Sequence, residues 1–321
     1  MKRAVVIGID YKNTKNELNG CIKDSERMVS FLLNNGWEKE NILHITDLSL
    51  LKPTKNIILK SFEWLLNDKK ENEFWSSYKN FELENLCSIF SLFKSFYNNK
   101  ILNNKLLNNN NNEHKKRENN KQKRILFFHF SGHGISLDTG VQIPDKNDEE
   151  IDGLDECLCP LEINSENDLI TDDEIKKELI IKGNENDKIF ICADCCHSGT
   201  LSDLKYYFNS SMAADQNDKL KQEYNNNEKI LCKSIMLSGC EDDDYSNELI
   251  IEKIPSGVLT HCLIELLNSE NKNLDFLKFI LKLRNNMKKY SNQKPCINFS
   301  HKELIESNNT TSGFKEYLNL F

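Results

Sequence analysis

The chain has 321 residues, of which 38% are hydrophobic, and its formal net charge at pH 7 is −8. This length and apolar content suffice for one large or two ordinary domains with a buried core, which excludes a fully disordered chain. The negative net charge argues against a general nucleic-acid-binding protein, so no nucleic-acid partner is expected.

The cysteines and the start of the sequence both indicate the cytosol. The first apolar run is closed by Asp10, which makes it too short for the core of a signal peptide. No other segment approaches the length of a membrane span. Eleven cysteines without an export signal, odd in number and irregularly spaced, indicate reduced thiols. We therefore expect a cytoplasmic protein with no membrane span.

Short apolar runs alternate with segments of helical periodicity along the chain. The apolar runs predict strands at residues 3–9, 42–46, 125–130, 189–193 and 235–238. Helical spacing predicts helices from Cys21 to before Gly36 and over residues 57–66, 259–267 and 276–283. This alternation predicts an α/β fold with a mostly parallel central sheet and helices on both faces.

Two polar stretches interrupt the pattern. Residues 67–123 contain an aromatic-rich part, an asparagine tract and a basic run, and the tract is too polar to fold alone. The aromatic part is either an amphipathic helix on the domain's own core or a surface for a membrane or partner. The basic run is either a solvated loop or a localisation signal. We interpret this stretch and residues 208–229 as mobile insertions in a single domain, residues 1–321.

A predicted interior strand ends in a cluster of reactive residues, in the sequence KIFICADCCHSGTLSDL. Residues 188–193 alternate as a strand, and Ser198-Gly199 supplies the turn that ends it. In open α/β sheets this end of a strand exposes polar side chains to a crevice. Another strand end carries His133 between two glycines, which permit a tight turn. If the two strands are neighbours, a cysteine beside His133 can become a nucleophilic thiolate.

The residues alone do not decide between Cys195 and Cys196 as the nucleophile, because adjacent residues on a turn point in different directions. A zinc or redox site that uses both cysteines with Cys192 and His197 is a further alternative. No second ligand pair stands at zinc-like spacing, and Cys192 lies inside a strand, so this alternative is disfavoured.

These motifs resemble those of the metacaspases, which are caspase-like cysteine peptidases. FFHFSGHG and DCCHSG carry the resemblance, and LNGCIKDSERM, DGLDECLCPLE, MLSGCEDDDYS and GVLTHCLIELL extend it in the family's order. The resemblance implies a caspase-like sandwich in which Cys196 is the nucleophile and His133 the general base. It also implies an oxyanion hole formed by the backbone amides of Gly134 and Cys196. We expect a monomer that acts on protein substrates.

Acidic residues near the nucleophile indicate the substrate. We expect Asp194 and Asp24 to project into the crevice, and the resemblance adds Cys21 and Ser131 to the same substrate-binding pocket. Paired carboxylates suit a substrate Lys or Arg, whereas an enzyme that cleaves after Asp would need basic residues there. For Asp24 alone, an exposed acid at a helix start is the alternative. The sequence departs from the family at Lys23, where Asn is usual, and a lysine there would temper the pocket's negative potential.

A second group of acids indicates Ca²⁺. Residues 145–156 are rich in carboxylates, and Asp172 and Asp173 follow at a predicted helix start. Clustered carboxylates repel one another unless a hard cation lies among them. The alternative for the helix start is an ordinary capping box of Thr171 and Glu174. By the resemblance, the Ca²⁺ ligands are Asp155, Asp172, Asp173 and Asp203.

The sequence therefore predicts a Ca²⁺-activated cysteine endopeptidase that cleaves after Lys or Arg. It also predicts self-cleavage after Lys219, Lys221 or Lys229. Two alternatives remain: a catalytically silent scaffold that acts through its inserts, and a caspase-type peptidase specific for Asp.

Overall fold

The computed structural model describes residues 1–67, 75, 123–138, 154–209, 221–223, 229–241, 248–251, 253–269, 274–304 and 317. The chain divides into two compact units, one of Met1–Asn67 with Lys123–Phe321 and the other of Asp68–Gln122. The second unit coincides with the predicted insert, and apart from Trp75 it lies outside the described residues. The fold described below is that of the first unit.

A central sheet of eight strands organises the first unit, in the order β2-β1-β3-β7-β10-β13-β8-β9. Its strands are β1 (Lys2–Gly8), β2 (Ile42–Thr46), β3 (Arg124–Ser131), β7 (Asp187–Asp194), β8 (Tyr206–Asn209), β9 (Lys221–Glu223), β10 (Lys233–Ser238) and β13 (Cys296–Phe299). The five strands from β2 to β10 are parallel, and each of the last three is antiparallel to its neighbour. All five predicted strands are present, and the predicted mostly parallel sheet is confirmed.

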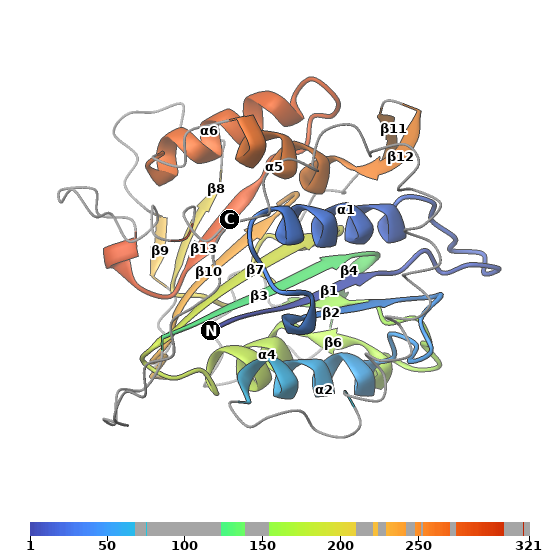
Figure 1. The fold of residues 1–321 in the computed structure, drawn as a ribbon, viewed down its shortest axis with the longest axis horizontal. Coiled ribbons are helices and arrows are strands. Elements are labelled where there is room, and N and C mark those ends of the chain that lie inside the picture. The colour runs from blue at the N-terminus through green and yellow to red at the C-terminus, as the bar shows by residue number, and fades with distance from the viewer. Residues whose placement is uncertain are drawn as a thin grey trace, which may run out of the picture. The chain divides into compact units, whose positions relative to one another are not determined.

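Helices cover both faces of this sheet (Figure 1). On one face lie α1 (Cys21–Asn34), α5 (Val258–Ser269) and α6 (Phe276–Met287), and on the other lie α2 (Lys55–Leu66) and α4 (Asp172–Ile175), which continues as a π-helical turn (Lys176–Ile180). Short 3₁₀ turns span Lys39–Asn41, Glu166–Asp168 and Lys302–Leu304. None of the helices in the described part is long and apolar enough to cross a membrane.

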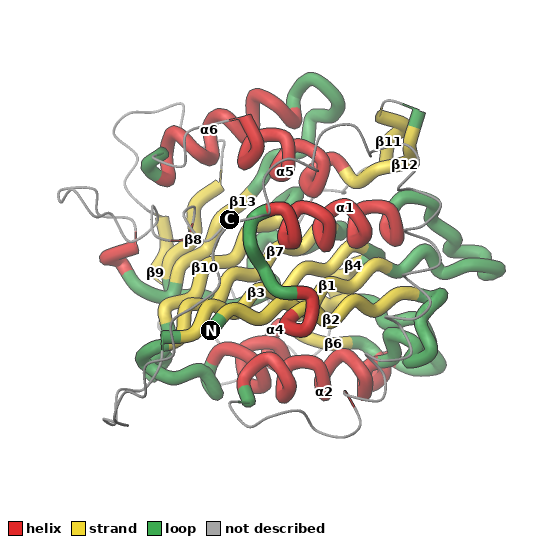
Figure 2. The backbone as a smooth tube through the Cα atoms, in the orientation of Figure 1, coloured by secondary structure: helices red, strands yellow, loops and turns green. Residues whose placement is uncertain are grey.

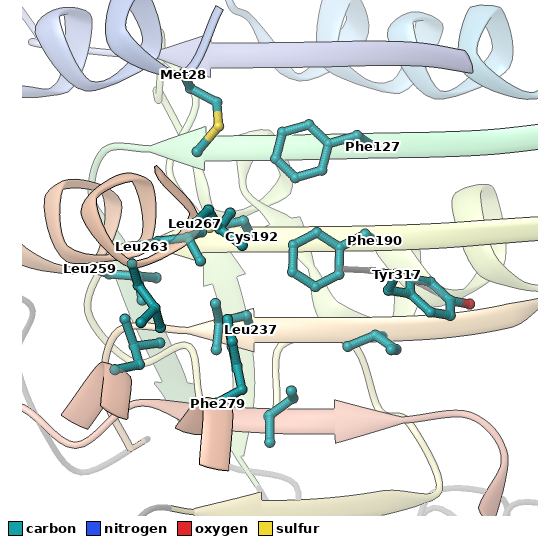
Figure 3. Packing of buried hydrophobic residues seen from close by; sticks show 14 of the residues in the cluster. Met28, Phe127, Phe190, Cys192, Leu237, Leu259, Leu263, Leu267, Phe279 and Tyr317 are labelled. Atoms are coloured by element: carbon teal, nitrogen blue, oxygen red, sulfur yellow. The ribbon is translucent and has the colours of Figure 1, made fainter. Parts of the chain in front are cut away.

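The core between the sheet and the three helices α1, α5 and α6 holds β3 against β7. Phe127 and Phe190 are register partners on these two strands, and their rings stack with centroids 5.7 Å apart. Apolar side chains from the helices, including Met28, Leu263 and Phe279, belong to the same buried cluster (Figure 3). Each such aromatic pair contributes about 1 kcal/mol beyond its buried area. The packing thus fixes the two strands that carry His133 and the cysteine pair.

Two smaller sheets were not predicted from the sequence. One consists of β4 (Gly134–Asp138), β5 (Leu154–Leu158) and β6 (Ile170–Thr171), and the other is the hairpin of β11 (Glu248–Ile251) and β12 (Ile254–Gly257). Figure 2 shows the β11–β12 hairpin apart from the central sheet. Because β4 begins immediately after His133, the chain leaves the central sheet there and pairs elsewhere.

The stretch expected as a loop at residues 208–229 begins in one strand and contains another. Phe208 belongs to β8, and β9 occupies Lys221–Glu223 within the central sheet. Pairing at the edge of the sheet supplies backbone hydrogen bonds to a polar sequence that shows no strand pattern of its own. Most residues between these two strands lie outside the described part, so their predicted mobility stays a prediction.

Candidate active site

The carboxyl ends of β1, β3 and β7 meet at one edge of the sheet. Gly8 lies beside Ser131, and Ser131 lies beside Asp194. Because the chain runs from β1 to β2 on one side while β3 lies on the other, this edge is a switch point of the topology, where open α/β sheets bind ligands. His133 lies two residues after Ser131, and Cys196 lies two residues after Asp194, the register partner of Ser131. The expectation that the two strands are neighbours is confirmed.

Both glycines around His133 are required by close contacts. A Cβ atom on Gly134 would lie 2.2 Å from the carbonyl oxygen of Cys196, and one on Gly132 would lie 2.9 Å from the hydroxyl oxygen of Tyr11. Among the described glycines Gly36 is the one with a positive φ, so the close contacts of Gly132 and Gly134, rather than an unusual backbone conformation, require glycine at these positions. Glycine is needed after His133 because the backbone of Gly134 lies against the backbone of Cys196.

The two adjacent cysteines differ in the burial of their side chains. The Cys195 side chain is 1% exposed, and burial raises the pKa of this thiol well above its usual value. Cys196 is half-buried, and it is the one cysteine among those the structure describes that is not fully buried. Burial also raises the pKa values of the nearby thiols Cys159 and Cys240 to about 12. The accessible thiol at this strand end is therefore that of Cys196.

The backbone turns sharply directly after Cys196. His197 has a φ of 48°, in the left-handed region that non-glycine residues rarely adopt. Such strain costs of order 1 kcal/mol and is found where the surroundings hold a functional residue in place. Ser198 contributes to that hold, since its hydroxyl donates to the Cys195 carbonyl oxygen over 2.8 Å.

The two histidines near this edge differ in what they can do. His129 is fully buried within β3, and burial lowers its pKa to about 3, so it remains neutral. His133 is half-buried, and its Nε2 lies 2.8 Å from the carbonyl oxygen of Asn16. A carbonyl oxygen only accepts, so Nε2 carries a proton and Nδ1 is left to exchange one.

The four residues predicted for substrate binding lie together. The Ser131 hydroxyl donates to the Asp24 carboxylate over 3.2 Å and also hydrogen-bonds the Cys21 thiol. A Cβ atom on Gly257 would lie 2.3 Å from Asp194 Oδ2 and 2.7 Å from Asp24 Oδ2. Both carboxylates therefore converge on Gly257, and we call Asp24 and Asp194 the acidic pair.

The start of α5 supports the acidic pair. Asp24 Oδ2 accepts from the Gly257 amide over 2.7 Å, and Asp194 Oδ2 accepts from the Thr260 amide over 2.8 Å. Amides at a helix N-terminus stabilise negative charge. These contacts hold the pair together although both side chains are buried.

Asp24 also contacts a cation that the sequence analysis did not identify. The Arg27 guanidinium, one turn later on α1, forms an ion pair with Asp24. Burial and the neighbouring Asp194 raise the pKa of Asp24 well above its usual value, against the opposing effects of Arg27 and the Gly257 amide. The alternative of an exposed helix-start acid is wrong, because Asp24 is 0% exposed. Lys23, expected beside the pocket, instead pairs with Glu26 in an exposed position.

All four predicted metal ligands belong to the residues that the structure describes. Asp172 is buried at the first turn of α4 and accepts from the amides of Glu156 and Asp173, whereas Asp173 is exposed. The carboxylate of Asp203 lies 3.8 Å from the Lys176 ammonium. Within the described part, no three His, Cys, Asp or Glu side chains form a group that could hold a metal ion. Residues 145–153 of the acidic stretch lie outside it. The predicted capping box of Thr171 and Glu174 is confirmed.

Glu156 links Asp172 to the segment that follows Cys196. Its carboxylate accepts from Ser136 on β4 over 3.2 Å and from Thr200, four residues after Cys196, over 2.9 Å. Its backbone amide donates to Asp172. The sequence analysis did not single out Glu156, because a carboxylate among many in an acidic stretch carries no signal of which one is buried.

Comparisons with known proteins agree with this arrangement. A family model described as metacaspase, peptidase C14 domain, matches residues 2–78, and one described as caspase domain matches residues 79–305. Metacaspase-1 of Candida albicans is 25% identical over 94% of this chain and 65% of its own length. Metacaspase-1 of Plasmodium falciparum is 28% identical over 91% of this chain and 39% of its own length. The chain thus spans two thirds or less of these relatives. Protein GSU0716 from Geobacter sulfurreducens has a crystal structure with a similar fold, with a TM-score of 0.52 at 15% identity and 94% coverage of both chains.

Proposed function

This chain belongs to the metacaspases, a family of caspase-like cysteine endopeptidases, and we propose that it cleaves proteins after Lys or Arg with a Cys196–His133 dyad and depends on Ca²⁺. One observation supports the dyad: the backbone of Gly134, next to His133, packs closely against the backbone of the half-buried Cys196. The expected monomeric state and cytoplasmic location stay predictions.

In this proposal the Cys196 thiol gives its proton to Nδ1 of His133, and the thiolate attacks the substrate carbonyl carbon. The bond between Nε2 and Asn16 supports this assignment, because it orients the imidazole and stabilises the imidazolium that forms. The imidazolium then gives its proton to the leaving amine, and water hydrolyses the thioester. The amides of Gly134 and Cys196 are proposed to stabilise the oxyanion.

The acidic pair supports the preference for a basic residue before the scissile bond. The carboxylates of Asp24 and Asp194 are buried and converge on Gly257, and burial together with Asp194 raises the pKa of Asp24, so a substrate cation between them would relieve their repulsion. A negatively charged substrate side chain would be repelled at the same place.

The donor chemistry supports Ca²⁺ as the metal. The residues proposed to hold it are Asp155, Asp172, Asp173 and Asp203, and carboxylate oxygens are the ligands that Ca²⁺ prefers. The buried Asp203 carboxylate already faces the ammonium of Lys176, so positive charge is favourable beside it. The ion would neutralise these carboxylates. Glu156 contacts both Asp172 and Thr200. Ordering of the Asp172 region by the ion would therefore also order the segment that carries Cys196.

A panel of fluorogenic peptides tests the function. Peptides with Arg, Lys or Asp before the cleaved bond are assayed with Ca²⁺ and with excess EGTA. We expect turnover of the Arg and Lys peptides in Ca²⁺ alone. Cleavage after Asp would favour the caspase-type alternative, and no turnover of any peptide would favour the silent scaffold.

Removal of the metal ligands is expected to abolish the Ca²⁺ response. Activity should rise steeply between roughly micromolar and millimolar Ca²⁺, with Mg²⁺ a poor substitute because it requires a smaller octahedral site. The double variant Asp172→Ala, Asp173→Ala should lose the response while circular dichroism still reports a folded chain. Asp168→Ala removes a half-buried carboxylate from the capping box of another short helix and is the matched control. Full wild-type activity in EGTA would refute the metal requirement.

Self-cleavage is expected between β8 and β10. Of the three predicted sites, Lys221 lies in β9, where pairing with β8 keeps the backbone from entering an active site. We therefore expect mass spectrometry of active protein to find new termini after Lys219 or Lys229. The Cys196→Ala variant should stay intact under the same conditions. An uncut wild-type chain that still turns over peptide would contradict the prediction.

A further inference from the structure

The loop that follows β1 lies against His133, and apart from Asn16 it has no role in the function proposed so far. Tyr11 in this loop is 4% exposed and has a φ of 50°, which is unusual for a bulky residue. A strained backbone conformation persists where surrounding contacts enforce it. Tertiary contacts, rather than its own conformational preference, therefore hold Tyr11 in this conformation.

The Tyr11 side chain contacts His133 in two ways. Its hydroxyl accepts from the His133 amide over 2.9 Å and donates to the Cys159 carbonyl over 2.6 Å. The Cys159 amide in turn donates to the His133 carbonyl over 3.1 Å, so three residues close a ring of hydrogen bonds around the His133 backbone. The phenol and imidazole rings also pack, with centroids 4.7 Å apart and planes at 38°.

The loop holds Tyr11 firmly on both sides. The buried Asp47 carboxylate accepts from the amides of Asp10 and Lys12, the two residues that flank Tyr11. The Tyr11 carbonyl accepts from the Thr14 hydroxyl over 2.8 Å. Farther along the same loop, Asn16 supplies the carbonyl that accepts from Nε2 of His133. One loop therefore fixes both the backbone and the ring of this histidine.

We propose that Tyr11 is a positioning residue for His133, which holds the imidazole where it exchanges a proton with Cys196. This inference rests on the proposed Cys196–His133 dyad. Burial raises the pKa of Tyr11 well above its usual value, so the phenol keeps the proton that it donates to Cys159. The ring limits rotation of the imidazole on one side, while the bond to Asn16 limits it on the other.

Tyr11→Phe is the test, because it removes the hydroxyl and keeps the ring. The variant leaves the His133 amide and the Cys159 carbonyl without their partner, so the imidazole loses its alignment. We expect kcat to fall roughly 10-fold to 100-fold while KM stays within about twofold. Alkylation of Cys196 by iodoacetamide, followed by peptide mass spectrometry, should be slower at neutral pH, with the midpoint of its pH profile shifted upward.

Tyr207→Phe is the matched control. Tyr207 is also buried, and its hydroxyl lies 3.3 Å from the Cys296 Sγ atom, on β8 and away from His133. It should lose comparable stability and keep both kcat and the alkylation profile. If Tyr11→Phe does not fold, Thr14→Val replaces it, since this variant loosens the Tyr11 backbone and should shift the profile in the same direction by less.

His133→Ala separates failure of this inference from failure of the dyad. If alkylation of Cys196 is as fast in His133→Ala as in the wild type, the dyad itself is wrong. If His133→Ala slows alkylation while a folded Tyr11→Phe matches the wild type in kcat and pH profile, the positioning role of Tyr11 is overturned and the dyad stands.

Discussion

Replacement of Cys196 by alanine is expected to lower kcat/KM for an Arg peptide by at least roughly a thousandfold, because the acyl-enzyme route disappears with the nucleophile. The same change at Cys195 should keep most of the activity. The two residues are adjacent, but the Cys195 thiol is buried and its pKa is raised well above the usual value, whereas Cys196 is half-buried. A buried, protonated thiol is neither a good nucleophile nor within reach of a substrate.

Cys195→Ala is thus the matched control for Cys196→Ala. The bonds that order this turn run to the Cys195 carbonyl oxygen, from the Ser198 hydroxyl and from the Cys240 thiol, and they survive loss of the side chain. Circular dichroism should report a folded chain for both variants. A loss of activity in Cys195→Ala as large as that in Cys196→Ala would overturn the assignment of the nucleophile.

Asp194→Asn is expected to erase most of the preference for Arg and Lys over neutral residues. A substrate cation in the wild type would pair with a buried carboxylate, and removing one partner of such a pair costs roughly 3–5 kcal/mol, or about two to four orders of magnitude in rate. The asparagine keeps an oxygen that accepts from the Thr260 amide, so the start of α5 should remain intact. The measurement is the ratio of kcat/KM values for Arg and neutral peptides.

Asp275→Asn makes the same chemical change at the start of the neighbouring helix. Asp275 caps α6 by accepting from the Lys278 amide over 2.8 Å, much as Asp194 accepts from Thr260 on α5. This control should leave the preference for basic residues unchanged. An unaltered preference in Asp194→Asn, or efficient cleavage after Asp by the wild type, would contradict the proposed pocket.

The fold class and the position of the site could be read from the sequence. Interior strands such as β3 and β7 are buried on both faces, so their sequences are nearly continuous apolar runs that are visible without tertiary information. The polar residues that end those runs, His133 and Cys196, therefore marked the functional edge of the sheet. Short strands such as β6 and β9 lacked such runs, because neighbouring strands rather than their own side chains define them.

Only the tertiary structure shows which candidate residues are accessible and which partners they contact. The choice between Cys195 and Cys196 depends on burial, which differs between two adjacent residues of the same type. The contacts of Asp24 with Gly257, and of Tyr11 with His133, join segments that are far apart in the chain and share no periodic pattern. Patterns along the chain report periodicity and average burial, whereas hydrogen bonds and charge pairs depend on the positions of single atoms that only the packed fold brings together.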